Sequence, residues 1–199
     1  MALNRREFNK QETVRHIRST FMSLYAESGI DGITVSNLCK ACGIAKSTFY
    51  LYFDDKYQIL EAVEDNVLYQ LREVCNGFRS CDFRSGDLRQ PLENARATVR
   101  CLTENGDTIR ALMGKHGDPR FSYKWKKNIA DAFRDSFRAA KGDNSSADIA
   151  CTIFSSGVIG LYTQFLFDGP QVTERELAII LINLARFSLY DFEAFAEDI

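Results

Sequence analysis

Two cysteines three residues apart are the first side chains in this sequence whose spacing suggests chemistry. Cys39 and Cys42 form a C-x-x-C motif in the stretch CKACGIAKSTFYLYF, residues 39–53. That spacing occurs in zinc sites and in redox-active thiol pairs. The same stretch passes through Gly43 into small polar residues and then aromatic residues, which is typical of two short helices joined by a tight turn. The motif alone leaves both interpretations open.

Other candidates for catalysis or metal binding are few. The chain has two histidines, His16 and His116, and neither forms a C-x-x-C…H-x-x-x-H pattern. Cys101 and Cys151 could act as nucleophiles, but both lie in apolar helical patterns and are expected in the core. The sequence has no paired carboxylates in a recognisable motif and no Gly-rich phosphate loop. We therefore expect no catalytic residue and no enzyme.

The elements that position these residues are predicted to be helices. The chain has only three prolines, and proline is the residue that most often interrupts a helix. Apolar residues recur at three- and four-residue steps, and no segment alternates as a strand does. The fold class is therefore all-α, with about nine helices. Their predicted ranges are 8–28, 35–41, 45–51, 54–78, 88–105, 107–115, 119–140, 147–167 and 174–195.

Helix starts are marked by side chains that can accept a hydrogen bond from the first turn. Thr34 is placed to cap the helix that begins at Val35. Asp55 with Gln58, and Thr173 with Glu176, have the three-residue spacing of a capping box.

Charge is distributed unevenly along the chain. The net charge is −2, but residues 1–53 hold seven Lys and Arg against four Asp and Glu, a balance of +3 that leaves −5 for residues 54–199. A basic N-terminal module on an acidic body is consistent with DNA binding at one end, and chance scatter of surface charge is the alternative.

Three consecutive helices with a glycine at the second turn are the pattern of a helix-turn-helix unit. The segment ITVSNLCKACGIAKSTFYLYFDDKYQIL, residues 33–60, resembles the TetR family of bacterial transcription regulators. The signature of that family is T-V-x-x-I-A-x-x-A-G-V-S-x-x-T-x-Y-x-x-F-x-x-K-x-x-L, and the resemblance covers roughly residues 8–75. The positions in register are Thr34, Val35, Ala41–Gly43, Thr48, Tyr50, Phe53, Lys56 and Leu60.

The register of this resemblance also bears on the cysteines. It places Cys39 and Cys42 where the family has small apolar residues packed inside the three-helix unit. Free cysteine behaves as a small hydrophobe, so its volume suits those positions. A zinc site would need two further ligands. The resemblance therefore implies no metal, no redox role and no cofactor.

The resemblance implies roles for individual residues in DNA binding. Phe49 and Phe53 should point into the core and fix the recognition helix. The start of that helix, which enters the major groove and touches base edges, holds Lys46, Ser47 and Thr48. The implied phosphate contacts are Thr34, Tyr50, Tyr52 and Lys56. For the two tyrosines the alternative is partly buried packing with a solvated hydroxyl.

Some positions depart from the family pattern. Ala45 stands where the family usually has a serine, so the recognition helix lacks a side-chain cap, a loss of order 1 kcal/mol. Ser47 and Leu51 are also less usual at their positions. The operator sequence therefore does not follow from that of a relative.

In this family the helices after the DNA-binding unit bind a small effector and form the dimer interface. We accordingly expect a DNA-binding domain at 1–53, connected by the helix 54–78, and a ligand-binding and dimerisation domain at 54–199. The segment 147–167 is apolar nearly all round, and with 174–195 it resembles the four-helix interface of a homodimer. The alternative is an ordinary buried helix of a monomer.

The middle of the chain carries a shorter resemblance. LMGKHGDPRFSYKWKKNI, residues 112–129, resembles the C-terminal subtype of TetR-like regulators related to the dihydroxyacetone-kinase regulators, which share a G-x-x-G-D-x-x-F motif. His116, Phe121, Tyr123 and Trp125 could line an effector pocket there. The alternatives are core packing for the aromatic residues and a structural hydrogen bond for the histidine. The nearby lysines are expected to be solvated.

These resemblances imply a homodimeric repressor that binds a palindromic DNA operator and responds to a small-molecule effector. The effector would favour a separation between the two DNA-binding domains of the dimer that no longer matches successive major grooves, which lie ~34 Å apart. The first alternative is an activator or partner-dependent regulator of the same fold. No apolar run approaches the ~18 residues of a membrane span, and no secretory signal is present, so we expect a cytoplasmic protein with reduced thiols and no membrane partner.

Overall fold

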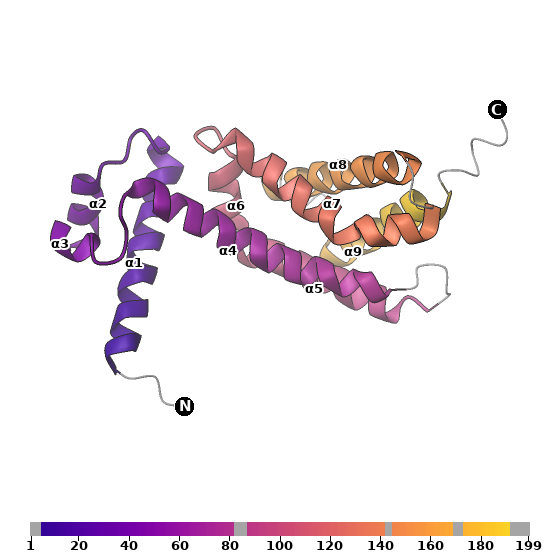
Figure 1. Ribbon diagram of the computed structural model, residues 1–199, viewed down its shortest axis with the longest axis horizontal. Helices are drawn as coiled ribbons and strands as arrows, with labels where there is room; N and C mark the ends of the chain where they lie inside the picture. Colours follow the sequence, from indigo (N-terminus) through magenta and orange to yellow (C-terminus); the bar gives the residue numbers. More distant parts are fainter. Residues whose placement is uncertain (1–4, 82–86, 142–144, 169–172, 192–199) are drawn as a thin grey trace. The chain divides into compact units, whose positions relative to one another are not determined.

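The computed structural model describes residues 5–81, 87–141, 145–168 and 173–191, and every regular element in these ranges is helical (Figure 1). The all-α prediction with about nine helices is confirmed. In chain order the elements are α1 (Arg5–Ser28), α2 (Val35–Cys42), α3 (Lys46–Phe49), α4 (Lys56–Asn76), the 3-10 helix η1 (Gly77–Ser80), α5 (Arg89–Glu104), α6 (Gly106–Met113), α7 (Pro119–Lys141), α8 (Ser145–Phe167), α9 (Glu174–Arg186) and the π-helical turn η2 (Phe187–Asp191).

Two helices are shorter than their sequence patterns predict. The segment 45–51, predicted as a helix, contains only one α-helical turn, α3. After α3 the backbone forms turns with hydrogen bonds between residues three apart. In those turns Leu51 N–H donates to the carbonyl of Thr48 (3.3 Å), and Tyr52 N–H to that of Phe49 (2.9 Å). The segment predicted over 174–195 leaves the α conformation at Arg186, and its last residues, 192–195, lie outside the described residues.

The helix caps agree with the sequence prediction. Thr34 Oγ1 accepts from the N–H of Asn37 (3.1 Å), and Asn37 Oδ1 accepts from the N–H of Thr34 (2.8 Å). Thr173 and Glu176 form the same reciprocal box at α9. At the start of α4 the box is displaced by one residue, because the Gln58 side chain accepts from the N–H of Asp54 rather than that of Asp55.

The chain divides into two compact units. The first comprises Met1–Asn66 with Thr108–Phe121, and the second comprises Val67–Asp107 with Ser122–Ile199. The division falls inside α4, later than the predicted boundary at 53–54. The reason is that Ile59, Leu60 and Val63, in the first half of α4, are buried in the first unit. The loop after α6 belongs to that unit as well.

Gly29 shows how closely this loop approaches the end of α1. It has a left-handed φ of 67°, and its N–H donates to the carbonyl of Tyr25 (2.9 Å), which closes the helix. A Cβ at Gly29 would lie 3.1 Å from Cβ and 3.2 Å from the carbonyl oxygen of His116. The loop conformation in turn requires Gly117, since a Cβ there would lie 2.1 Å from the carbonyl oxygen of Leu112.

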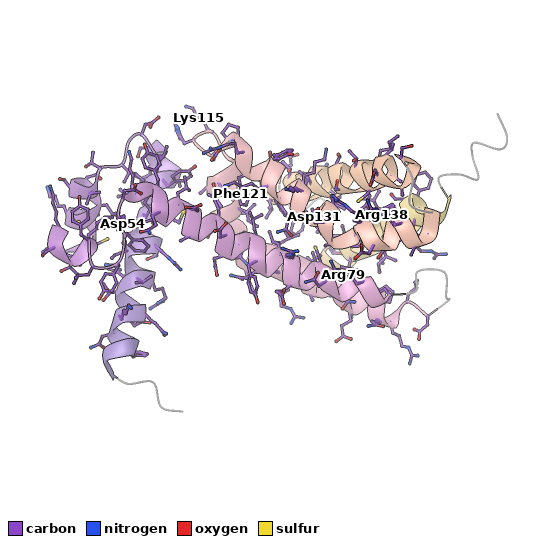
Figure 2. All side chains as sticks on the ribbon, in the orientation of Figure 1. Asp54, Arg79, Lys115, Phe121, Asp131 and Arg138 are labelled. Carbon is purple, nitrogen blue, oxygen red and sulfur yellow. The ribbon has the colours of Figure 1, made fainter. Side chains whose placement is uncertain are left out.

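The second unit has an aromatic core. Phe133 packs against Phe78 and Phe154, with ring centroids 5.8 and 4.8 Å away, and Trp125 stacks on Tyr162 at 5.5 Å. Within this unit α5 lies along α9, and α9 also contacts α8 (Figure 1). Arg79, labelled in Figure 2, donates from Nε to the carbonyl of Ala132 in α7 (3.2 Å). Hydrogen bonds and ring contacts therefore both hold α7 in this unit.

The helix α8 corrects one sequence expectation. By length and composition, the segment Ala147–Phe167 of this helix could span a membrane, and no other helix among the described residues could. The core helices of soluble proteins are often as long and as apolar, and 39% of the most apolar part of α8 is buried within the protein. Phe154, Val158 and Tyr162 are buried, whereas Ile149 and Ile153 are exposed. The helix is thus apolar on both its buried and its exposed side.

We predict that two glycine substitutions in the first unit differ in cost. Gly43→Ala should lower the free energy of unfolding by about 1 kcal/mol, because φ is 66° but no described atom lies within 4 Å of the new Cβ. Gly29→Ala adds contact with His116 to the same backbone strain and should cost about 2 kcal/mol or more. Urea denaturation of both variants measures the difference. Equal costs would contradict the close approach of His116.

Candidate nucleic-acid interface

The short helix α3 exposes a polar side and buries an aromatic one. Lys46 and Ser47 are exposed and Thr48 is half-buried, whereas Phe49 is completely buried. Phe49 contacts the ring of Phe53, which is also buried, at a centroid distance of 6.0 Å. Burial of these two rings agrees with the sequence prediction. A single helical turn anchored in this way keeps its polar side available to another molecule.

The aromatic residues after α3 differ in exposure. Tyr50 is 56% exposed, and the edge of its ring packs on Phe49 at a centroid distance of 5.3 Å with an interplanar angle of 86°. Tyr52 is half-buried, while Leu51 is exposed. The phenol of Tyr50 is thus held in position by its ring and still open to solvent, which is the property required of a phosphate contact. Tyr52 fits either of its two predicted roles.

Thr34 combines a structural and a potential binding role. Its hydroxyl oxygen caps α2 by accepting from Asn37, and Asn37 also donates from Nδ2 to the carbonyl of Gly32 (3.2 Å). A hydroxyl that accepts in this way keeps its own proton for a second partner. The Thr34 hydroxyl is therefore fixed in place and able to donate.

The ammonium group of Lys56 is held by the protein itself. Nζ donates to the carbonyl oxygens of Ile30 and Ile33, each at 2.8 Å, and it lies 5.3 Å from the ring centroid of Tyr57. These bonds attach the start of α4 to the loop between α1 and α2. An ammonium has three N–H donors, so one remains for a phosphate. The structure thus gives Lys56 a positioning role that the sequence prediction did not include.

All seven predicted DNA contacts belong to the first unit. They come from the start of α2, from α3, from the loop between α3 and α4, and from the first residue of α4 (Figure 1). Asp54, labelled in Figure 2, lies in that same loop. The contacts between α1 and α2 and between α2 and α3 hold these segments together.

The two cysteines of the C-x-x-C motif are part of the core. Cys39 and Cys42 are both buried and both free thiols. Burial raises the pKa of Cys39, which disfavours the thiolate that a metal or a redox reaction would need. Within the described ranges no three His, Cys, Asp or Glu side chains gather closely enough to hold a metal ion. The side chains of this motif thus serve packing.

The four residues predicted to line an effector pocket differ in their solvent exposure. Phe121 and Trp125 are buried, His116 is exposed, and Tyr123 is 70% exposed. The second unit does contain an apolar cavity of about 20 Å³, but none of the four lines it. Its lining residues are Cys75, Phe78, Ile129, Phe133, Phe154, Val158, Tyr162, Leu181 and Ala185. This cavity is thus distinct from the predicted pocket, which stays a prediction, although Trp125 stacks on one wall of the cavity, Tyr162.

A polar groove on α1 was missed by the sequence prediction. It lies beside the turn between α2 and α3 and is lined by Glu12, Thr13, Arg15, His16, Ser19 and Ile44. The sequence did contain a signal for this groove: polar residues recur at three- and four-residue steps along α1. They fall on a different face from the buried apolar residues Ile17 and Phe21.

Two family models match the chain. Residues 17–63 match the bacterial regulatory proteins of the tetR family, and residues 89–187 match a transcriptional regulator C-terminal region. A curated relative, the HTH-type transcriptional regulator YvdT of Bacillus subtilis, is 36% identical over 56 residues. That match spans 28% of this chain and 29% of the relative, so it concerns less than a third of either protein.

Solved structures of similar fold cover most of the chain. A TetR transcriptional regulator from Streptococcus agalactiae has a TM-score of 0.64 at 20% identity, over 90% of this chain and 96% of that one. The dihydroxyacetone kinase operon activator DhaS has a TM-score of 0.56 at 17% identity, over 89% and 96%. The fatty acid degradation regulator FadR from Bacillus halodurans has a TM-score of 0.57 at 14% identity, over 86% and 93%. At these identities the likeness shows the fold alone.

Proposed function

Because the chain belongs to the TetR family of bacterial transcriptional regulators, we propose that it is a cytoplasmic repressor that binds a palindromic operator as a homodimer. The observation that carries this proposal is the form of α3, a single turn with Lys46 and Ser47 exposed above a fully buried Phe49. Family and fold also point to a DNA-binding regulator rather than to an enzyme.

The proposed contacts divide into two kinds. Lys46, Ser47 and Thr48 would reach base edges from the start of α3, which enters the major groove. The phosphate contacts would be the hydroxyls of Thr34, Tyr50 and Tyr52 and the remaining N–H of Lys56. The second group fixes the register of the protein on the duplex, so that the first group can read the sequence.

We predict that Lys46→Met lowers affinity for DNA about 10-fold or more without altering stability. Its side chain is exposed, so the fold does not depend on it. The probe is a duplex selected from random sequences by the unaltered protein, measured over a series of salt concentrations. Because Lys46 is assigned to base edges, its loss should also reduce the discrimination between the selected duplex and one of altered sequence. Tyr50→Phe should weaken binding with the salt slope unchanged, because the hydroxyl is neutral.

The matched control for Lys46→Met is Lys127→Met, an exposed lysine on α7 in the second unit. It should bind the selected duplex as the unaltered protein does. Equal affinity for the Lys46 and Lys127 variants would show that α3 is not the recognition helix.

The proposed dimer interface is the outer face of the last two helices. Large apolar side chains on α8 and α9 are 37–58% exposed in the single chain, namely Ile149, Ile153, Phe167, Ile179 and Ile180. Gly157 and Gly160 lie on α8 and are also exposed, which allows close approach of a second helix. A second copy of the chain would cover these side chains and would present two heads to successive major grooves.

We predict that Gly160→Asp converts the dimer to a monomer and abolishes tight operator binding. No described atom lies within 4 Å of a Cβ at Gly160, so the single chain has room for the new side chain. In a dimer the same carboxylate would be buried against the partner without a counter-charge. The control is Ala139→Asp, at an exposed position on α7. Sedimentation that shows a dimer for both variants would place the interface elsewhere.

If the second unit binds an effector, its cavity favours an uncharged apolar molecule. Burial raises the pKa of Cys75 to about 12 and that of Tyr162 well above its usual value, so both are neutral at physiological pH. A volume of about 20 Å³ holds roughly one water molecule, so the helices must separate before a metabolite can enter. Release from DNA would then follow from tighter binding of the effector to the separated state.

The small cavity also favours a second candidate, an activator or partner-dependent regulator whose second unit binds another protein instead of a small molecule. One relative of similar fold, DhaS, is named an operon activator. The two candidates differ in a thermal-shift experiment with a panel of apolar metabolites. Effector control predicts that one of them raises the unfolding temperature, whereas partner control predicts that none does.

A further inference from the structure

The groove on α1 adjoins the end of the recognition helix that is proposed to enter the major groove. Glu12, Arg15 and Ser19 fall at three- and four-residue steps and so share one face of α1. Across the groove from them, Ile44 lies one residue before Ala45, the N-cap of α3. A duplex that receives the start of α3 therefore passes close to this face of α1.

The spacing between α1 and the start of α3 is fixed by direct contacts. His16 Nε2 lies 3.3 Å from the carbonyl oxygen of Cys42, the last residue of α2. Gly43 then closes α2 in the left-handed conformation, and Ile44 N–H donates to the carbonyl of Cys39 (3.0 Å). Below these contacts Ile17 and Phe49 are completely buried. The groove and the recognition helix therefore approach DNA together.

Arg15 is the side chain in the groove that is able to bind a phosphate. Thr13 and Ser19 use their hydroxyl protons in bonds to the carbonyls of Asn9 (2.8 Å) and His16 (3.0 Å), respectively. Arg15 is 77% exposed, and its guanidinium has a planar fork of donors that matches phosphate geometry. In the free protein one Nη of Arg15 donates to Oε2 of Glu12 (2.7 Å).

The pair between Arg15 and Glu12 neutralises the groove without fixing it. Their hydrogen bond lowers the pKa of Glu12 and raises that of Arg15, so both remain ionised at neutral pH. Exposed ion pairs of this kind are weak and are screened by salt. A DNA phosphate carries a full negative charge, and its neutralisation releases condensed counterions. A DNA phosphate can therefore compete with Glu12 for the guanidinium of Arg15.

We propose that Arg15 leaves Glu12 on operator binding and contacts a phosphate of the strand beside the major groove, so that Glu12 lowers affinity by competing for Arg15. This inference rests on the proposed DNA-binding function. It adds α1 to the DNA-binding surface and assigns opposite effects to two neighbouring charges. Because the contact is to the backbone, it strengthens binding without reading the sequence.

Opposite responses of two variants test the proposal on the selected duplex. Arg15→Gln should lower affinity about 3-fold or more between 50 and 200 mM salt and reduce the salt slope by about one. Glu12→Gln should raise affinity by about 2-fold or more, since Arg15 is then free for the phosphate. The double variant should bind as Arg15→Gln does, because Glu12 acts only through Arg15.

Arg89 and Asp87 provide the matched control. They form an exposed pair of the same kind in the second unit, with Nη2 of Arg89 2.6 Å from Oδ2 of Asp87. Arg89→Gln and Asp87→Asn should leave affinity and salt slope unchanged. Thermal unfolding of all variants checks that the fold is intact.

Each remaining outcome counts against the proposal. Affinity of Arg15→Gln equal to that of Arg89→Gln removes α1 from the interface, while a loss of binding by Lys46→Met in the same assay leaves the proposed function standing. Failure of the unaltered protein to select any duplex would remove the proposed function itself, whereas unchanged binding by Lys46→Met would remove α3 as the recognition helix. If Arg15→Gln weakened binding but left the salt slope unchanged, the pair would have a structural role. The same conclusion would follow if Glu12→Gln weakened binding.

Discussion

The proposed DNA-binding surface depends on the burial of two phenylalanine rings, Phe49 and Phe53. A helix of four residues is too short to be stable by itself, because nucleation of a helical turn costs more than one turn of hydrogen bonds returns. Ala45 adds no stability at the N-terminus, since its methyl side chain cannot cap the helix. Phe49 and Phe53 hold the segment against the rest of the first unit by their burial and their mutual contact. The position of Lys46 and Ser47 in space is thus a consequence of packing beneath them.

The same unit joins the proposed DNA-binding segments to a loop far along the chain. Residues 114–118, between α6 and α7, pack against Gly29 so closely that a methyl group would be in contact with His116. Four residues after Gly29, the carbonyl oxygen of Ile33 accepts a hydrogen bond from Lys56 Nζ, and the adjacent Thr34 caps α2. Any displacement of the loop must therefore be accommodated at the end of α1, next to two of the proposed phosphate contacts.

The second unit combines a closely packed interior with an apolar exterior. Its aromatic rings leave a cavity of about 20 Å³, whereas α8 and α9 expose isoleucine and phenylalanine side chains. Exposure of so many large apolar groups on adjacent helices is typical of a surface that another protein covers. The free energy available from burial in this unit is thus greater at its outer face than in its cavity.

Local sequence determined the elements of this protein and the polar character of the exposed side of α3. Periodicity predicted about nine helices, and the capping residues marked the starts of α2 and α9. These features follow from interactions over three or four residues, which a sequence displays directly. Tertiary structure alone decided that the first unit extends into α4 and includes 108–121, and that Lys56 binds carbonyls 23 and 26 residues away. It also decided which aromatic residues surround the cavity and which polar residues of α1 face the turn before α3. Such contacts join residues far apart in the chain, and they depend on how the helices pack rather than on the pattern within any one helix.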